Sequence, residues 1–288
     1  MALLESVPNV SEGRDPMVVE AVARAFAKRG RVLDIHSDPE HHRSVYTLVA
    51  DEGELADVLF AGIARAAELI DLRAHDGIHP RVGAADVVPI VPLTTGQMPR
   101  ACGVALELGR RVGDELGLPV FLYGESGDGL RPAFFRRGGP AELQRRIDDR
   151  ELRPAFGPMR LDPRAGAVMI GARPLLIAFN VELRTGDLAD AQAIAAAIRA
   201  SSGGLPGVQA LGLLLPASGR VQVSINVIDV GTAPLVAVVA AVREAATERG
   251  VEVGSSELVG LLPESAAADP ALLGLAALPD DRVLERRL

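Results

Sequence analysis

Cysteine and aromatic residues are scarce in this sequence of 288 residues, which contains one Cys, two Tyr, seven Phe and no Trp. The single cysteine, Cys102, excludes an intrachain disulfide and any zinc or iron–sulfur site that needs several thiolates. Proteins without a disulfide framework are typical of reducing compartments, so we expect a cytoplasmic location. The few aromatic rings leave little surface for stacking against a ligand.

An excess of positive charge and long apolar runs are missing as well. The 30 Lys and Arg residues are outnumbered by 38 Asp and Glu, a net charge of −8, which argues against a general nucleic-acid-binding protein. A protein with this net charge can bind a small anionic ligand only where Lys and Arg side chains are concentrated locally. No apolar stretch is long enough to span a bilayer, and Glu5 and Pro8 interrupt the N-terminal stretch where a signal peptide has its apolar core. We expect neither membrane association nor a targeting segment.

What the sequence does contain is a globular composition, with 48% hydrophobic and 24% charged residues over a length suited to two domains. Apolar periodicity, caps and turn residues predict the order strand–helix–strand–strand–helix–strand in each half of the chain. In the first half these elements are expected at residues 3–10, 18–27, 31–36, 43–50, 53–72 and 86–93, followed by a helix at 97–116 and a strand at 119–123. In the second half they are expected at residues 175–183, 188–200, 208–215, 220–229, 234–249 and 251–262.

This order predicts an α+β protein made of two ferredoxin-like βαββαβ subdomains in tandem, residues 1–173 and 174–288, with mostly antiparallel sheets and helices on one face. Two stretches rich in Gly and Arg stand apart from the pattern. Residues 124–140 are predicted to be a mobile loop. Residues 153–171 hold three Pro, three Gly and three Arg, and are predicted to connect the two domains.

Titratable side chains concentrate in one part of the chain, because all five His fall between positions 36 and 79. Gly77 and Pro80 make a helix over residues 74–85 improbable, so this stretch is predicted to be a rigid irregular loop that leads into a buried strand. General acid–base chemistry by His79 fits best, since Pro80 stiffens its backbone and Arg81 places a cation next to it. For His75 we expect a hydrogen bond that braces the loop. For His41 and His42 a solvated turn and a functional role are equally compatible with the sequence.

Two other kinds of site receive less support. The five His, together with Asp34, Asp38, Asp76 and Asp86, have the chemistry of a divalent-metal site, but their spacing matches no zinc motif, so we expect no metal. The run 124–129, GESGDG, resembles a nucleophile elbow only loosely, because Asp128 stands where that motif needs Gly.

Several motifs resemble the formiminotransferase family, and they follow one another in order over almost the whole chain. They are VPNVSEG at 7–13, HPRVGAADV at 79–87, LYGE at 122–125, FGP at 156–158, GA at 166–167, GAR at 171–173, LIAFN at 176–180 and ELVGL at 257–261. The resemblance implies transfer of the formimino group from N-formimidoyl-L-glutamate to N5 of tetrahydrofolate, a step of histidine degradation. It also implies two similar α/β subdomains, a homodimer, a folate site along a charged tunnel and, as a possible partner, a separate cyclodeaminase.

The resemblance also assigns roles to residues. The family's catalytic histidine falls on His79. The candidates for donor contacts, Asp34, His36, Arg43 and Arg81, follow instead from the chemistry of the donor. Its cationic amidinium could pair with Asp34, Asp38 or Glu12, and the carboxylates of the two substrates need cations, for which Arg43, Arg81, Arg160 and Arg164 are candidates. The folate-binding positions would be Gly157, Pro158, Met159, Arg160, Leu161, Asp162, Pro163, Arg164, Ala165, Gly166 and Gly203.

One departure from the family keeps other functions open. Animal members carry Asp at the position of His36, and a neutral formyl group needs no carboxylate partner, so a formyltransferase acting on N-formylglutamate is an alternative. A metal-dependent amidohydrolase built on the His and Asp cluster, and a non-catalytic folate-binding or scaffold protein, are further alternatives.

Overall fold

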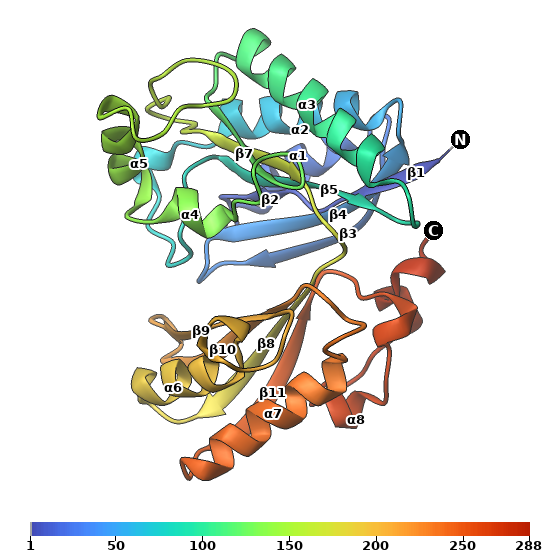
Figure 1. The fold of residues 1–288 in the computed structure, drawn as a ribbon, viewed down its shortest axis with the longest axis vertical. Helices are drawn as coiled ribbons and strands as arrows, with labels where there is room; N and C mark the ends of the chain where they lie inside the picture. Colours follow the sequence, from blue (N-terminus) through green and yellow to red (C-terminus); the bar gives the residue numbers. More distant parts are fainter. Residues whose placement is uncertain (1) are drawn as a thin grey trace. The chain divides into compact units, whose positions relative to one another are not determined.

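The computed structural model describes residues 2–288. The chain forms two compact units, Met1–Pro174 and Leu175–Leu288, each with its own sheet and helices (Figure 1). The first sheet is mixed and has seven strands, and the second is antiparallel and has four. The predicted α+β class is therefore confirmed. Within residues 2–288 no helix has both the length and the apolar character needed to cross a membrane.

The first unit orders its sheet as β3–β4–β1–β5–β7–β6, with the short β2 between β4 and β5 beyond the end of β1. All pairs among β1 to β5 are antiparallel, whereas β7 runs parallel to both β5 and β6. The elements are β1 (Leu3–Ser6), β2 (Asn9–Val10), α1 (Pro16–Phe26), β3 (Arg31–Asp38), β4 (Arg43–Asp51), α2 (Leu55–Leu69), the 3₁₀ turn η1 (Leu72–Ala74), β5 (Ala85–Pro92), α3 (Met98–Glu115), β6 (Val120–Gly124), α4 (Pro132–Arg136), α5 (Gly139–Asp148) and β7 (Val168–Ala172).

The stretch 153–171, predicted to connect two domains, instead ends in β7, a strand in the interior of the first sheet. Met169 and Ile170 are fully buried there. The glycines of this stretch provide close backbone approach rather than flexibility: a Cβ on Gly171 would lie 2.1 Å from the Tyr123 carbonyl oxygen. The prediction of a connector was therefore wrong.

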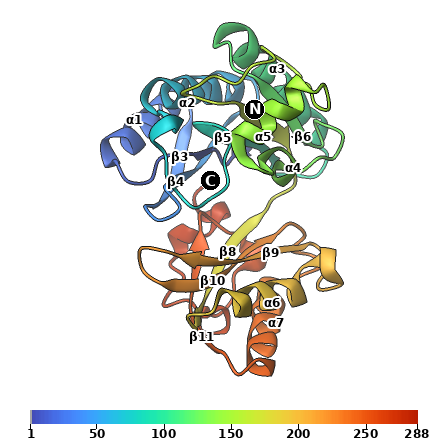
Figure 2. The same ribbon diagram turned by 90° about the vertical axis from the view of Figure 1, so that its left-hand side faces the viewer.

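Helices cover both faces of the first sheet, contrary to the prediction of one covered face. Figures 1 and 2 show α1, α2 and α3 side by side, and these helices share a core with Val88 and Ile170. The alternate residues Val87 and Met169 belong to a second cluster, with Phe135 of α4 and Leu143 of α5. Parallel strands such as β5, β7 and β6 are normally buried on both faces, which explains the second layer. The loop predicted at 124–140 thus contains the packed helix α4.

The second unit repeats the predicted order of elements, and its antiparallel sheet is ordered β11–β8–β10–β9. Alternation along the strands explains its core, since Phe179, Val181, Val223 and Ile225 are all buried in one cluster. The elements are β8 (Ile177–Arg184), α6 (Leu188–Ile198), η2 (Ala200–Ser202), β9 (Val208–Leu215), β10 (Arg220–Val227), α7 (Leu235–Glu248), β11 (Glu252–Val259), η3 (Glu264–Ala266), α8 (Pro270–Leu273), η4 (Asp280–Arg282) and η5 (Leu284–Arg286).

Candidate active site

Three segments of the first unit meet around the predicted loop: the turn after β2, the β3–β4 hairpin and residues 75–86. Two glycines permit this contact. A Cβ on Gly13 would lie 2.4 Å from the Asp38 carbonyl oxygen, and a Cβ on Gly77 would lie 2.5 Å from that of His41. Real Cβ atoms do not approach so closely, so the sequence needs glycine at both positions for the three backbones to come together.

Asp86, at the start of β5, is the fully buried centre of the charged side chains. Its Oδ2 accepts hydrogen bonds from Arg43 Nη1 at 3.1 Å and Arg136 Nε at 2.9 Å, and its Oδ1 accepts one from the Val82 backbone N–H at 2.8 Å. Burial opposes ionisation of the Asp86 carboxyl, but Arg136 and Arg43 outweigh it and hold its pKa below the usual value. Asp86 is therefore an anion that fixes two cations.

Arg43, at the start of β4, is held from two sides. Besides its bond to Asp86, it donates to Asn9 Oδ1 from Nε at 3.0 Å and from Nη2 at 2.7 Å. Burial lowers the pKa of its guanidinium to about 10, so it stays charged at neutral pH. The predicted site residue Arg43 is thus a fixed cation beside His79.

His79 has its Nδ1 2.8 Å from the Pro80 carbonyl oxygen and 3.1 Å from Arg43 Nη1. Because the nearer partner, the Pro80 carbonyl oxygen, can only accept a hydrogen bond, we assign the proton to Nδ1, which then donates to this carbonyl and leaves the Nε2 lone pair available. Burial, followed by the charges of Arg43 and Arg136 and by His41, lowers the pKa of His79 well below its usual value. At neutral pH this imidazole is uncharged and able to accept a proton.

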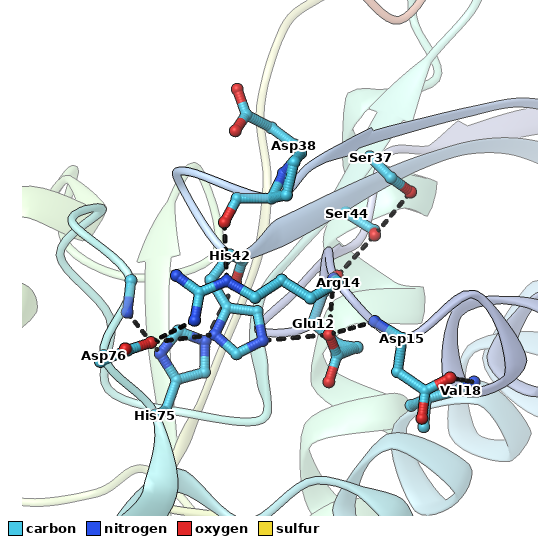
Figure 3. A network of polar contacts seen from close by, with 12 residues as sticks. Glu12, Arg14, Asp15, Val18, Ser37, Asp38, His42, Ser44, His75 and Asp76 are labelled. Carbon is cyan, nitrogen blue, oxygen red and sulfur yellow. Dashed lines mark hydrogen bonds and ion pairs between the residues drawn. The ribbon is translucent and has the colours of Figure 1, made fainter. Parts of the chain in front are cut away.

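His75 braces the loop, as predicted. Its Nδ1 accepts from the Gly77 backbone N–H at 3.2 Å, so its Nε2 donates to the His42 carbonyl oxygen at 3.0 Å. Burial, followed by Arg81 and His42, lowers the pKa of His75 to about 4. Its ring stacks on that of His42 with centroids 4.0 Å apart. Figure 3 shows this pair between Glu12 and Asp76, with His42 Nε2 3.0 Å from Glu12 Oε1.

His41 belongs to a second pair, formed with Asp38 at the tip of the β3–β4 hairpin. Asp38 Oδ2 lies 2.8 Å from His41 Nδ1, while its Oδ1 accepts the backbone N–H groups of Glu40 at 2.7 Å and His41 at 2.9 Å. Burial raises the pKa of Asp38, but these bonds outweigh it and bring the value to about 2. The ring of His41 meets that of His79 edge-on, with centroids 6.2 Å apart. Since His41 and His42 are both enclosed, the solvated-turn alternative was wrong for them.

The remaining predicted donor residues lie on the same side of the hairpin or on the loop. Asp34, His36 and Asp38 alternate along β3, opposite Thr47, Val45 and Arg43 of β4, so their side chains share one face. Arg81 donates from Nη2 to the Gly77 carbonyl oxygen and so closes the loop on itself. The structure brings Arg43, Arg81 and His79 together, and it places Asp34 and His36 in a row that leads away from them.

The predicted folate-binding segment is joined to the His79 loop at its far end. The Ala84 backbone N–H donates to the Ala165 carbonyl oxygen at 2.8 Å, and Gly166 has φ +72 with a Cβ position 2.1 Å from the Val82 carbonyl oxygen. Gly157 is equally constrained, with a Cβ position 2.2 Å from the Leu118 carbonyl oxygen. Both positions thus require glycine, because any side chain would collide with the neighbouring backbone.

Between these glycines the segment is largely open. Pro158, Met159, Arg160, Pro163 and Arg164 are exposed. Met159 also lines an open hollow of about 430 Å³ with Ile147, Asp148, Arg150 and Arg153. Gly203 lies in the second unit, where it ends η2 in the left-handed conformation.

Within residues 2–288, no group of three or more His, Cys, Asp or Glu side chains is arranged to hold a metal ion. Sequence reasoning missed three residues of the site: Asn9 as an acceptor for Arg43, Asp86 as its buried centre, and Arg136. Nothing in the sequence distinguishes Arg136 from Arg131 and Arg137 on either side of it. Its role depends on α4, which lies in a stretch that the sequence predicts to be a loop.

Comparison with known proteins gives matches over both units. Residues 3–173 match the family model of the N-terminal subdomain of the formiminotransferase domain, and residues 178–273 match that of the formiminotransferase domain. The chain is 41% identical over 300 residues to a glutamate formimidoyltransferase of Thermoplasma acidophilum, covering 100% of this chain and 98% of the relative. It is 35% identical to a glutamate formimidoyltransferase of Streptococcus pyogenes serotype M1, covering 93% and 92%. It is 36% identical to the formimidoyltransferase-cyclodeaminase of Sus scrofa, covering 93% of this chain but 52% of the relative.

Proposed function

The chain belongs to the formiminotransferase family, and from this we infer that it is a glutamate formimidoyltransferase, an enzyme that uses tetrahydrofolate. The observation that carries the inference is identity of 41% and 35% to relatives of that name over nearly their entire lengths. The reaction moves the formimino group of N-formimidoyl-L-glutamate to N5 of tetrahydrofolate, within histidine and folate one-carbon metabolism.

We propose His79 as the residue that accepts the proton of N5. Attack of N5 on the formimino carbon forms the new C–N bond and leaves a proton on N5 that must be removed. His79 is suited to this step because its Nε2 lone pair is available and nearby cations keep the ring neutral. The donor amidinium is itself an activated electrophile, so the step needs no metal ion.

We further propose that fixed cations and the β3 row orient the donor. Arg43 is occupied by Asn9 and Asp86, so its role is to keep His79 neutral through its charge, whereas Arg81 is the better candidate for a glutamate carboxylate. Asp34 and His36 lie on the same face of the hairpin and are proposed to contact the formimino end. Holding both reactants in one geometry supplies much of the acceleration.

For tetrahydrofolate we propose contacts with residues 158–164 and with Gly203. The exposed cations Arg160 and Arg164 are suited to the carboxylates of the folate tail. Ala165 and Gly166 are buried, so they serve in this proposal by shaping the segment. Gly157 is exposed, and it shapes the segment because a side chain there would clash with the Leu118 carbonyl oxygen.

The two units, 1–173 and 174–288 in this proposal, are ferredoxin-like subdomains. Each contains four strands ordered fourth–first–third–second, as β5–β1–β4–β3 in one and β11–β8–β10–β9 in the other. The first is extended by β7 and β6. A homodimer is part of the proposal and is tested by light scattering on the purified protein.

The test is an assay with two donors. Purified protein is incubated with tetrahydrofolate and either N-formimidoyl-L-glutamate or N-formylglutamate, and the ultraviolet spectrum of the folate product identifies the transferred group. We expect transfer from the formimino donor. Turnover with N-formylglutamate alone would favour the formyltransferase, the second candidate, for which the presence of His36 on the β3 face is the supporting observation.

A further inference from the structure

We propose that His41, held by Asp38, is a second proton-transfer residue of this reaction, which protonates the departing glutamate nitrogen while His79 takes the proton from N5. The inference rests on the proposed function and adds to it a division of acid and base roles. It starts from the edge-on contact of the two imidazoles, whose ring centroids are 6.2 Å apart.

The orientation of His41 is fixed in a way that leaves one nitrogen for chemistry. Its Nδ1 is bound to Asp38 Oδ2 at 2.8 Å, and Asp38 is itself held by two backbone N–H groups of the hairpin. The Nε2 of His41 has no hydrogen-bond partner within the described residues 2–288. A carboxylate bound to one imidazole nitrogen orients the ring and stabilises its protonated form, while the other nitrogen exchanges a proton.

The two histidines lie in opposite electrostatic surroundings. His79 contacts the cation Arg43, with Arg136 beyond it, so its neutral form is favoured. His41 contacts the carboxylate of Asp38 instead of a guanidinium. Two neighbouring imidazoles, one beside a guanidinium and the other beside a carboxylate, are suited to act as base and acid in one reaction.

The proton balance of the step is complete. N5 attacks the formimino carbon, and its proton passes to Nε2 of His79 as the new C–N bond forms. The bond between that carbon and the glutamate nitrogen then breaks, and this nitrogen receives a proton from Nε2 of His41. The cycle leaves His79 protonated and His41 neutral, and exchange of one proton through water between rings at this separation restores both.

Charged groups around the pair come from four elements. Asp38 lies at the end of β3, Arg43 at the start of β4, Asp86 on β5 and Arg136 on α4. The neighbouring His42 is turned to Glu12 and Asp76 instead, although its side chain is as enclosed as that of His41, at 13% against 11% exposed. His42 therefore offers a matched control in the same turn.

The experiment compares the pH dependence of kcat for the wild type, His41→Asn and His42→Asn, with N-formimidoyl-L-glutamate and tetrahydrofolate. The side-chain amide of asparagine can still donate a hydrogen bond to Asp38, as Nδ1 of His41 does, but asparagine does not titrate. We expect a bell-shaped profile for the wild type. His41→Asn should lose the alkaline limb, keep the acid limb and lower kcat by about 10²–10⁴-fold, the usual effect of a positioned acid. His42→Asn should lower thermal stability and keep both limbs.

Asp38→Asn provides a second variant in case His41→Asn does not fold. Its oxygen still accepts the two backbone N–H groups, but the anion that stabilises the protonated imidazole is gone, so the alkaline limb should move to lower pH. The role of His41 would be overturned if the alkaline limb does not move in Asp38→Asn, or if a folded His41→Asn keeps both limbs. Neither result would affect the proposed function of the enzyme. An inactive wild type would instead overturn the proposed function, and with it this inference.

Discussion

Replacing Asp86 with Asn should destabilise the first unit strongly. The substitution keeps the shape of the side chain and the acceptor for the Val82 N–H, but it removes the charge that pairs with Arg43 and Arg136. Asp86 is 0% exposed, and the side chains of Arg43 and Arg136 are 11% and 14% exposed, so water replaces little of the lost interaction. Removing one partner of a buried ion pair costs about 3–5 kcal/mol.

For a unit of this size a cost of about 3–5 kcal/mol corresponds to a fall in Tm of roughly 6–20 °C. The assay can report on the first unit alone, because both tyrosines of the chain, Tyr46 and Tyr123, are buried in it and the chain has no Trp. Near-ultraviolet circular dichroism of tyrosine therefore follows this unit, whereas the far-ultraviolet signal follows both. We therefore expect Asp86→Asn to show its lower Tm in the near-ultraviolet circular dichroism of tyrosine.

The matched control is Glu52→Gln, which removes the exposed pair with Arg100, whose N–O distance is 3.0 Å. Exposed pairs contribute about 0–1 kcal/mol, so this variant should behave like the wild type. The pH dependence gives an independent check. The pKa of Asp86 is lowered on folding, so its contribution is present above the unfolded pKa of about 3.9 and is lost as pH falls through the folded value. A loss below about 1 kcal/mol in Asp86→Asn at neutral pH would refute this account of a buried, charged centre.

Three further predictions follow from the site. His79→Ala should fold and bind tetrahydrofolate but lower kcat by about 10²–10⁴-fold, measured with the formimino donor; wild-type turnover would contradict the assignment of the base. Gly166→Val should prevent folding of the first unit, because its Cβ would meet the Val82 carbonyl oxygen at 2.1 Å, whereas Gly203→Ala, with open space around it, should fold; circular dichroism separates the two. Dialysis against a chelator should leave activity unchanged, since the amidinium needs no Lewis acid, and recovery of a lost activity by zinc or magnesium would favour the amidohydrolase alternative.

Sequence periodicity predicted the order of strands and helices well, because that order depends on local alternation and caps. It failed at β7 and α4, which are short and lie in stretches rich in Gly and Arg. The apolar residues of β7, Met169 and Ile170, face opposite sides of the sheet and so show no amphipathic pattern. Their burial is decided by the neighbouring strands β5 and β6, which the local sequence does not reveal.

The chemistry of His79 was predictable from its neighbours in sequence only in part. Its position before Pro80 and Arg81 suggested a fixed base, but the charges that keep it neutral come from Arg43 and Arg136, which are distant in sequence and meet only at Asp86. The same holds for His41. Its partner Asp38 is three residues away in sequence, but its proposed role depends on the contact of its ring with that of His79, which lies on a different loop. A cluster of histidines in a sequence therefore does not separate an acid from a base. That separation is made by which of them the fold places beside a carboxylate and which beside a guanidinium.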